Sequence, residues 1–117
     1  MSKVLIVDDD KTLAGIIQDV LTEVDQSAVV ATSAEDAITI LSTQNDIVTV
    51  LADYRLNGEL SGIEMLRAAR SRDPNLRCLL MSGDVSSIPE DVERLKSENI
   101  EVLAKPLRMK ELVEKLC

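Results

Sequence analysis

Short apolar runs alternate with amphipathic segments along the whole of this chain of 117 residues. Five of these runs have the length of buried β-strands, and most of them are rich in valine, isoleucine and leucine. The predicted strands are Lys3 to Val7, Ser27 to Ala31 (the weakest), Ile47 to Asp53, Leu76 to Met81 and Ile100 to Ala104.

Between these runs, apolar side chains recur at intervals of three and four residues, which is the spacing of one face of a helix. Each such stripe predicts a helix that packs against the strands through that face. The stripes consist, in chain order, of Leu13, Ile16, Ile17, Val20, Leu21 and Val24; Ala34, Ala37, Ile38 and Leu41; Met65, Leu66 and Ala69; Val92 and Leu95, in a short helix from about Pro89 to Ser97; and Met109, Leu112, Val113 and Leu116.

Polar residues mark where the helices begin. Asp10 is suited to cap the first helix, because its side chain can accept hydrogen bonds from the N–H groups of the first turn. The segment from Thr32 to Asp36 and the pair Ser61 and Glu64 each have the hydroxyl-x-x-acid order of a capping box. The third helix is expected to end near Asp73, directly before a proline.

Alternation of five strands with five helices predicts a parallel sheet, because parallel neighbours need a crossover connection. Strands that are buried on both faces form nearly continuous apolar runs, as these do. We therefore expect one α/β domain over residues 1–117, with a five-stranded parallel sheet that is doubly wound by helices. A chain of this length can build one core but not two.

The chain carries 13 basic and 21 acidic side chains, a net charge of −8, and no histidine. This acidic balance argues against nucleic-acid binding, which depends on lysine and arginine neutralising phosphates. Without histidine, the chain has no imidazole nucleophile, general base or metal ligand of its own. No segment approaches the ~20 apolar residues of a membrane span, and the first residues show no signal-peptide pattern, so we expect a cytoplasmic protein. Cys78 and Cys117 are expected to be free thiols.

Five reactive side chains follow four of the predicted strands, at the point where each strand ends. They are Asp8, Asp9, Asp53, Ser82 and Lys105. Taken singly, each has an ordinary structural explanation, such as a helix cap, an Asx-turn, a turn hydroxyl or a solvated cation. Open α/β sheets, however, bind ligands beyond the carboxyl ends of their strands. The five side chains together therefore indicate a functional site at that edge.

If the strands lie side by side, Asp8, Asp9 and Asp53 converge. Carboxylates ~4–6 Å apart repel one another by roughly 4 kcal/mol per close pair at an effective dielectric constant near 20, so either a pKa rises or a cation binds. Oxygen ligands favour a hard cation, and Mg²⁺ suits a site that meets phosphate oxygens. With Asp53 as nucleophile, Ser82 as hydrogen-bond donor and Lys105 as a second positive charge, the set favours phosphoryl transfer onto Asp53.

These residues and their spacing resemble the receiver domain of two-component response regulators, over the whole length of the chain. The matching stretches are Val7-Asp8-Asp9, Asp53, Ser82-Gly83 and Lys105-Pro106. The resemblance implies a flavodoxin-like sheet of strand order 2-1-3-4-5. It also implies Mg²⁺ held by Asp8, Asp9, Asp53 and the backbone carbonyl of Arg55. In the same family pattern, Asp53 is the phosphoacceptor, Ser82 is the switch hydroxyl and Lys105 contacts the phosphoryl group.

The resemblance further implies that the phosphoryl group comes from a phosphohistidine on a sensor histidine kinase or a histidine phosphotransfer protein. The output would pass to a separate partner or to a tethered effector domain, neither of which the sequence identifies. No turnover of a separate substrate is expected, only the domain's own phosphorylation and dephosphorylation. One departure is Val102, which stands where the family has an aromatic switch residue. Tyr54 is the one aromatic side chain in the sequence, so that readout is missing.

Alternatives from other functional classes remain open at this point. The first is a receiver-fold interaction module that works without phosphorylation. The second is a haloacid-dehalogenase-type phosphatase that uses Asp8 and Asp10 of an Asp-x-Asp-x-Thr motif, although this leaves Asp53 without a role. Asp53→Asn would abolish phosphate uptake in a receiver, whereas Asp8→Asn would abolish nucleophilic attack in the phosphatase. A flavin carrier shares the fold class, but the chain lacks its phosphate-binding loop after the first strand.

Overall fold

The computed structural model describes residues 2–56, 60–83 and 92–116, apart from the side chain of Val92. Within these ranges, strands and helices alternate along the chain. The strands are β1 Lys3–Val7, β2 Ser27–Ala31, β3 Ile47–Asp53, β4 Arg77–Ser82 and β5 Ile100–Ala104. The helices are α1 Lys11–Glu23, α2 Ala34–Thr43, α3 Gly62–Arg72, α4 Val92–Ser97 and α5 Met109–Leu116.

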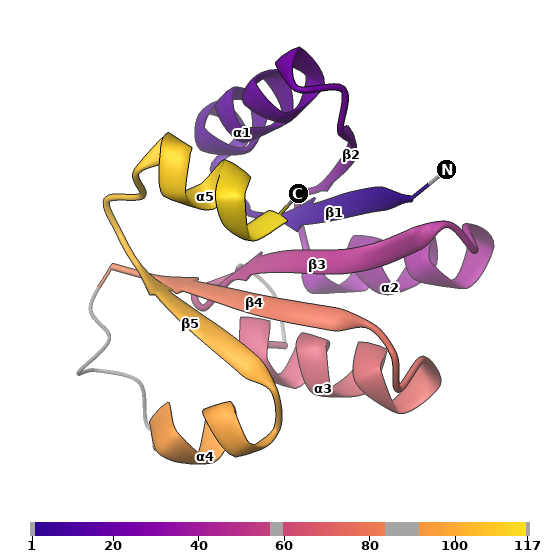
Figure 1. The fold of residues 1–117 in the computed structure, drawn as a ribbon. Helices are drawn as coiled ribbons and strands as arrows, with labels where there is room; N and C mark the ends of the chain where they lie inside the picture. Colours follow the sequence, from indigo (N-terminus) through magenta and orange to yellow (C-terminus); the bar gives the residue numbers. More distant parts are fainter. Residues whose placement is uncertain (1, 57–59, 84–91, 117) are drawn as a thin grey trace.

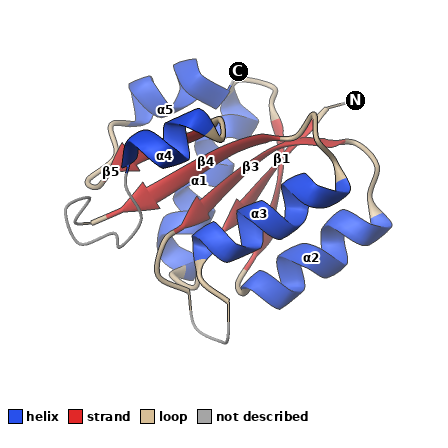
Figure 2. Cartoon of the chain, turned by 90° about the horizontal axis from the view of Figure 1, so that it is seen from below, coloured by secondary structure: helices blue, strands red, loops and turns tan. Residues whose placement is uncertain are grey.

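The strands form one parallel sheet in the order β2-β1-β3-β4-β5. Helices α1 and α5 cover one face of this sheet, and α2, α3 and α4 cover the other (Figure 1). Figure 2 shows the second face from below, with α3 and α2 side by side under the strands. These observations confirm the predicted doubly wound sheet and its strand order. None of the described helices is long and apolar enough to cross a membrane.

Neighbouring side chains of each strand enter two different hydrophobic cores, one on each face of the sheet. On the face of α2, α3 and α4, the core includes Val50 and Ala52 of β3 and Leu80 of β4. On the face of α1 and α5, the core includes Leu51 of β3 and Leu79 of β4. Because helices cover both faces of the sheet, polar and apolar residues do not alternate along the strands, which explains the continuous apolar runs in the sequence.

Side-chain caps begin the first two helices. The carboxylate of Asp10 accepts hydrogen bonds from the backbone N–H groups of Thr12 at 3.1 Å and Leu13 at 3.2 Å, which confirms the predicted N-cap. At α2, the Ser33 hydroxyl accepts from the backbone N–H of Asp36 at 3.0 Å. The return bond of a capping box is not formed among the described contacts of α2, because aspartate is one methylene shorter than the usual glutamate. The capping box predicted there is therefore only half present.

The predicted apolar stripe of α1 is wrong at two positions, since Ile16 is 47% exposed and Val24 is 48% exposed. The helix meets the sheet through Ala14, Ile17 and Leu21, which are fully or almost fully buried. These three residues lie three and four positions apart and form the centre of the contact. Ile16 lies to one side of that line, and Val24 is the C-cap residue beyond the last helical turn.

Other element boundaries differ only slightly from the predicted ones. Strand β4 begins and ends one residue later than expected, at Arg77 and Ser82. The predicted start of the fourth helix near Pro89 lies outside the described residues. Its inward residue Leu95 is fully buried, as expected.

The start of α3 lies unusually close to the end of β3. Ser61 and Glu64 form a complete capping box, each side chain accepting the other's backbone N–H at 3.2 Å. Gly62 directly follows this cap, and its N–H donates to the carbonyl of Tyr54 at 3.0 Å. A Cβ atom on Gly62 would overlap the backbone carbonyl of Asp53. Only glycine therefore permits this approach of α3 to the residue that ends the central strand.

Gly62→Ala is expected to lower the free energy of unfolding by about 1–3 kcal/mol, because the obstructing carbonyl of Asp53 belongs to the backbone and cannot rotate away. Urea denaturation followed by circular dichroism measures this change. Gly15→Ala in α1 is the matched control, since no heavy atom lies within 4 Å of its added methyl group. The free energy of unfolding of the control should rise by roughly 0.5–1 kcal/mol, because alanine has a higher helix propensity than glycine. A Gly62→Ala protein as stable as the wild type would contradict the close approach.

Candidate functional site

The pairing of β1 with β3 brings two acidic residues together at the carboxyl edge of the sheet. Val7 pairs with Ala52, so the next residues along the two strands, Asp8 and Asp53, are neighbours. The backbone N–H of Asp8 also donates to the carbonyl of Ala31 at 3.1 Å, which extends the ladder with β2 beyond the end of β1. The first acidic residue is therefore held by backbone bonds before its side chain makes any contact.

The pairing of β4 with β5 positions the hydroxyl and the lysine in the same way. Ser82 pairs with Ala104, and the backbone N–H of Lys105 then donates to the carbonyl of Ser82 at 2.8 Å. The two residues thus leave neighbouring strands at the same edge as the acidic pair. The parallel sheet alone places four of the five predicted site residues.

Three carboxylates form a cluster at this edge. Asp8, Asp9 and Asp53 each offer one carboxylate oxygen, and these oxygens all lie within 4.8 Å of one another. Asp8 is fully buried, Asp53 is 8% exposed and Asp9 is half-buried. Acidic side chains are rarely buried without a partner, so this cluster needs positive charge nearby.

Lys105 supplies part of that charge. Its Nζ lies 3.3 Å from Oδ1 of Asp53 and 3.8 Å from Oδ2 of Asp8, and the lysine side chain is 26% exposed. When all three carboxylates are ionised, one lysine leaves two negative charges uncompensated in a partly desolvated cluster. The lysine alone therefore cannot neutralise the site.

The effect of this uncompensated negative charge is evident at Asp8. Its Oδ1 accepts a hydrogen bond from the backbone N–H of Asp10 at 2.9 Å, whereas its buried Oδ2 has no hydrogen-bond partner. The pKa of the Asp8 carboxyl is raised to about 6, mainly by burial and also by the negative charges of Asp53 and Asp9. The hydrogen bond from Asp10 and the positive charge of Lys105 oppose this shift.

The cluster fits a divalent cation. A charge of +2 would balance the two uncompensated carboxylates, and Oδ2 of Asp8 is a buried oxygen in need of a partner. All the side-chain ligands are oxygen atoms, which is the donor set of Mg²⁺ and other hard cations. Coordination of Mg²⁺ by Asp8, Asp9 and Asp53 is thus compatible with the arrangement.

A cavity of about 330 Å³ opens beside the carboxylate cluster. It is lined by Asp53, Tyr54, Arg55, Ser82, Gly83 and Lys105. Ser82 is 4% exposed, so its hydroxyl belongs to the wall of the cavity rather than to the surface. The exposed residue Arg55 lies on the loop after β3, where its backbone carbonyl is the expected fourth protein ligand. The cavity is large enough for a phosphoryl group and water.

Two residues named in the sequence analysis have other surroundings. Asp10 is exposed, and its carboxylate is occupied by the N-cap bonds of α1. Val102 is half-buried on β5 and packs against the core under α4. An aliphatic residue therefore fills the position at which the family has its aromatic switch.

The family resemblance implied that the loop after β3 contributes the carbonyl of Arg55, but the bonds that hold this loop were not apparent from the sequence. The backbone N–H of Tyr54 donates to the carbonyl of Met81 at 2.8 Å, and its carbonyl accepts from Gly62 at 3.0 Å. These two bonds hold the loop that carries Arg55 between β4 and α3. The one sequence signal is a glycine directly after a capping serine, and that signal does not reveal which backbone it approaches.

Comparison with known proteins assigns the family. The family model described as the response regulator receiver domain matches residues 4–117. The chain is 32% identical over 115 residues to the transcriptional regulatory protein ZraR of Salmonella typhimurium, and 29% identical over 113 residues to the response regulator protein FleR of Pseudomonas aeruginosa. These matches cover 96% and 97% of this chain but 25% and 23% of those proteins. The chain thus spans about a quarter of their length.

Solved structures agree with this assignment. The receiver domain of Francisella response regulator 1452 matches with a TM-score of 0.84 and 28% identity, over 99% of this chain and 93% of that one. A receiver domain protein from Clostridium thermocellum matches with a TM-score of 0.86 and 23% identity, over 97% and 90% of the two chains. The second match supports the fold alone.

Asp8→Asn is expected to stabilise the protein in metal-free buffer. Because the pKa of Asp8 rises from 3.8 to about 6 on folding, the native state binds more protons than the unfolded state between these pH values. The wild type should therefore lose stability relative to Asp8→Asn as the pH rises through this window. At pH 7 the variant should be more stable by about 1–3 kcal/mol, as measured by urea denaturation in the presence of EDTA.

Asp46→Asn provides a control of opposite sign, because a hydrogen bond from Lys3 lowers the pKa of the partly exposed Asp46 carboxyl. Removing this carboxylate should cost stability at pH 7 rather than add it. An Asp8→Asn protein less stable than the wild type at pH 7 without metal would show that the buried charge is already neutralised by the protein itself.

Proposed function

Since the chain belongs to the response regulator receiver domain family, we propose that it accepts a phosphoryl group on Asp53 in a Mg²⁺-dependent reaction. The observation that carries this proposal is the cluster of Asp8, Asp9 and Asp53, two of them buried, with the Nζ of Lys105 3.3 Å from Asp53. Such a cluster combines a nucleophile, a place for a divalent cation and a lysine beside a cavity, which is what phosphoryl transfer requires.

The proposed reaction transfers the phosphoryl group from a phosphohistidine. A carboxylate oxygen of Asp53 attacks phosphorus and forms an O–P bond as the P–N bond breaks. The imidazole leaves with the electron pair of that bond and takes up a proton from solvent. Because the chain contains no histidine, a sensor histidine kinase or a histidine phosphotransfer protein must supply the donor.

Each remaining site residue has a role in this transfer. Lys105 releases Asp53 and pairs with an oxygen of the incoming phosphoryl group. The Ser82 hydroxyl, which lies in the same cavity wall, donates a hydrogen bond to a second oxygen. Mg²⁺ held by Asp8, Asp9, Asp53 and the carbonyl of Arg55 would supply the positive charge that brings the phosphoryl oxygens close to carboxylates.

Hydrolysis of the acyl phosphate restores the Asp53 carboxylate, so the domain acts on its own phosphoryl group and turns over no separate substrate. The output passes to a tethered effector domain or to a separate partner. One curated relative is named a transcriptional regulatory protein and another a response regulator protein, but this chain spans only about a quarter of their length. On the same family grounds, we propose a cytoplasmic location.

The phosphatase alternative is disfavoured by the position of Asp10. In a phosphatase of this type, the second aspartate of the Asp-x-Asp motif must act as general acid and base while the first aspartate acts as nucleophile. Here the Asp10 carboxylate accepts the N–H groups of Thr12 and Leu13 at the surface. The alternative of an interaction module without phosphorylation leaves the cost of the buried cluster unexplained.

Incubation with Mg²⁺ and acetyl phosphate is expected to add one phosphoryl group to the wild type and none to Asp53→Asn, because the variant lacks the nucleophile. EDTA should abolish the adduct, because lysine alone does not neutralise the cluster. Intact-protein mass spectrometry measures both results.

Asp46→Asn is the matched control, since it makes the same chemical change before the start of β3, at the opposite end of that strand from Asp53, and should leave the adduct intact. An adduct that persists in Asp53→Asn but disappears in Asp8→Asn would favour the phosphatase. A folded wild type without an adduct under any of these conditions would favour the interaction module.

A further inference from the structure

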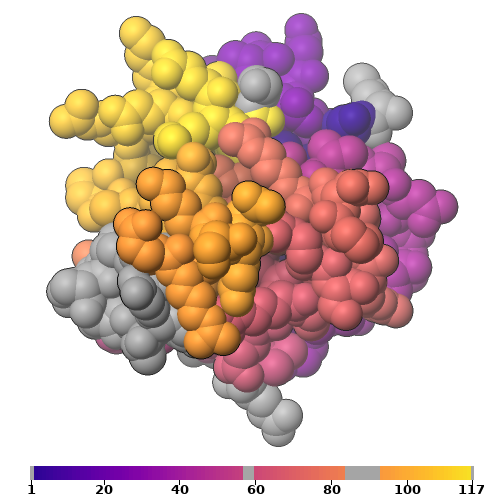
Figure 3. Space-filling view, turned by 60° about the horizontal axis from the view of Figure 1, so that its bottom comes forward, coloured from indigo at the N-terminus to yellow at the C-terminus, as the bar shows by residue number. Residues whose placement is uncertain are grey.

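Helix α4 belongs to the connection between β4, which ends in Ser82, and β5, which is followed by Lys105. Its described part spans Val92–Ser97, and short helices are marginally stable by themselves in water. Its Leu95 is fully buried against the sheet. In the space-filling view, the orange segment that contains α4 lies beside the segment of α3 (Figure 3), and Arg67 of α3 pairs with Glu98, which directly follows α4. Contacts to α3 must therefore provide part of its stability.

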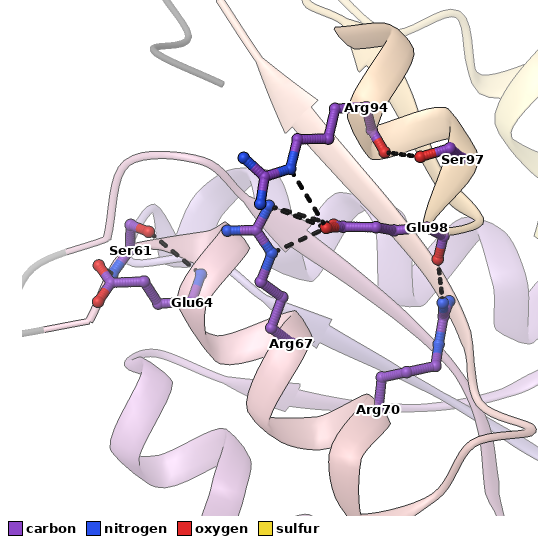
Figure 4. A network of polar contacts seen from close by, with 7 residues as sticks. All are labelled: Ser61, Glu64, Arg67, Arg70, Arg94, Ser97 and Glu98. Carbon is purple, nitrogen blue, oxygen red and sulfur yellow. Dashed lines mark hydrogen bonds and ion pairs between the residues drawn. The ribbon is translucent and has the colours of Figure 1, made fainter. Parts of the chain in front are cut away.

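The first of these contacts is an ion pair between Arg67 of α3 and Glu98, which directly follows α4. Arg67 Nε donates to Glu98 Oε2 at 3.2 Å, and Arg67 Nη2 lies 3.1 Å from the same oxygen. The two side chains are 36% and 33% exposed, so the pair is partly shielded from water. Arg94 of α4 also lies near this carboxylate, with its Nε 3.8 Å from Oε1 of Glu98 (Figure 4).

The second contact comes from Arg70, one turn further along α3. Its guanidinium donates to the backbone carbonyls of Leu76 at 3.0 Å, Asn99 at 2.9 Å and Glu98. The carbonyls of Glu98 and Asn99 follow the C-terminal end of α4, where positive charge is favoured by the helix dipole. Asn99 has φ 60°, so the chain turns sharply here into β5. We call Arg67, Arg70 and Glu98 together the α3–α4 clasp.

Strand β5 is held at its two ends by two different ionic contacts. It is an outer strand of the sheet and pairs only with β4. The clasp lies at its beginning, where Asn99 precedes Ile100, and Lys105 directly follows its end. Of its five residues only Ile100 is buried, whereas six of the seven residues of β3 are. Packing alone therefore restrains β5 much less than it restrains the central strand.

We propose that the α3–α4 clasp holds β5 and α4 in the arrangement in which Lys105 pairs with Asp53, and thereby opposes phosphorylation of the domain. This inference rests on the proposed function. A phosphoryl group on Asp53 must take the place next to the carboxylate where Nζ now lies at 3.3 Å. Lys105 then has to move, and the backbone of β5 moves with it more readily when its beginning is free.

The composition of β5 supports this role for the clasp. The strand has no aromatic side chain whose rotation could absorb a displacement of Lys105. Val102, at its centre, is a short aliphatic residue that is half-buried and packs against the core. The change is therefore passed along the strand to its other end, where the clasp resists it. A ligand shifts such an equilibrium only by its preference for one arrangement, and weakening the resting arrangement increases its apparent affinity.

Beryllofluoride, a phosphoryl analogue that binds an aspartate with Mg²⁺, tests the proposal at equilibrium. Arg67→Gln and, separately, Arg70→Gln should each bind it about three- to tenfold more tightly than the wild type, because each removes part of the clasp. Fluorine NMR measures the affinity. Hydrogen exchange of residues 93–104 should also be faster in both variants without the analogue.

Arg94→Gln is the matched control, because Arg94 contacts Glu98 from within the same segment and does not join α4 to α3. Its affinity should stay within about twofold of the wild type. Faster exchange in Arg67→Gln and Arg70→Gln with unchanged beryllofluoride affinity would overturn the proposal, as would unchanged exchange in both. Absence of a phosphoryl adduct on the wild type with acetyl phosphate would instead overturn the proposed function.

Discussion

The gathering of three carboxylates, two of them buried, at one edge of a parallel sheet is the constraint on which the rest of the site depends. Backbone pairing of β1 with β3 brings Asp8 next to Asp53, so these two residues stay neighbours as long as the sheet is intact. Lys105 offsets one negative charge, and the buried Oδ2 of Asp8, 3.8 Å from Lys105 Nζ, accepts no hydrogen bond. The site therefore has a deficit of positive charge, which a divalent cation would offset.

The same constraint explains why the far end of β5 matters. Lys105 is fixed in sequence to the last residue of an outer strand, so any change in its pairing acts on that strand. At the other end, arginines from α3 hold Glu98 and Asn99, which precede the strand. A change in the ionic partner of Lys105 is thus connected, through the five residues of β5, to the position of α4.

Much of this could be predicted from the sequence, because the alternation of strands and helices and the residues after each strand are local features. The strand order came from the family resemblance and not from the pattern. Periodicity failed at Ile16 and Val24, because spacing does not reveal how wide the contact of a helix with the sheet will be. Arg67 and Glu98 lie 31 residues apart within mixed-charge surface segments, so only the fold shows that they meet. Gly62 was visible as a glycine but not as a contact of Asp53.

The most direct test of the account is to locate the phosphoryl group. Borohydride reduces an aspartyl phosphate to homoserine, so treatment after incubation with Mg²⁺ and acetyl phosphate marks the acceptor permanently. Tandem mass spectrometry of the peptides then identifies the modified position. The account predicts homoserine at position 53 and nowhere else. Homoserine at position 8 or 10 would contradict it, because the nucleophile would then lie in the first acidic loop and not at the end of the central strand.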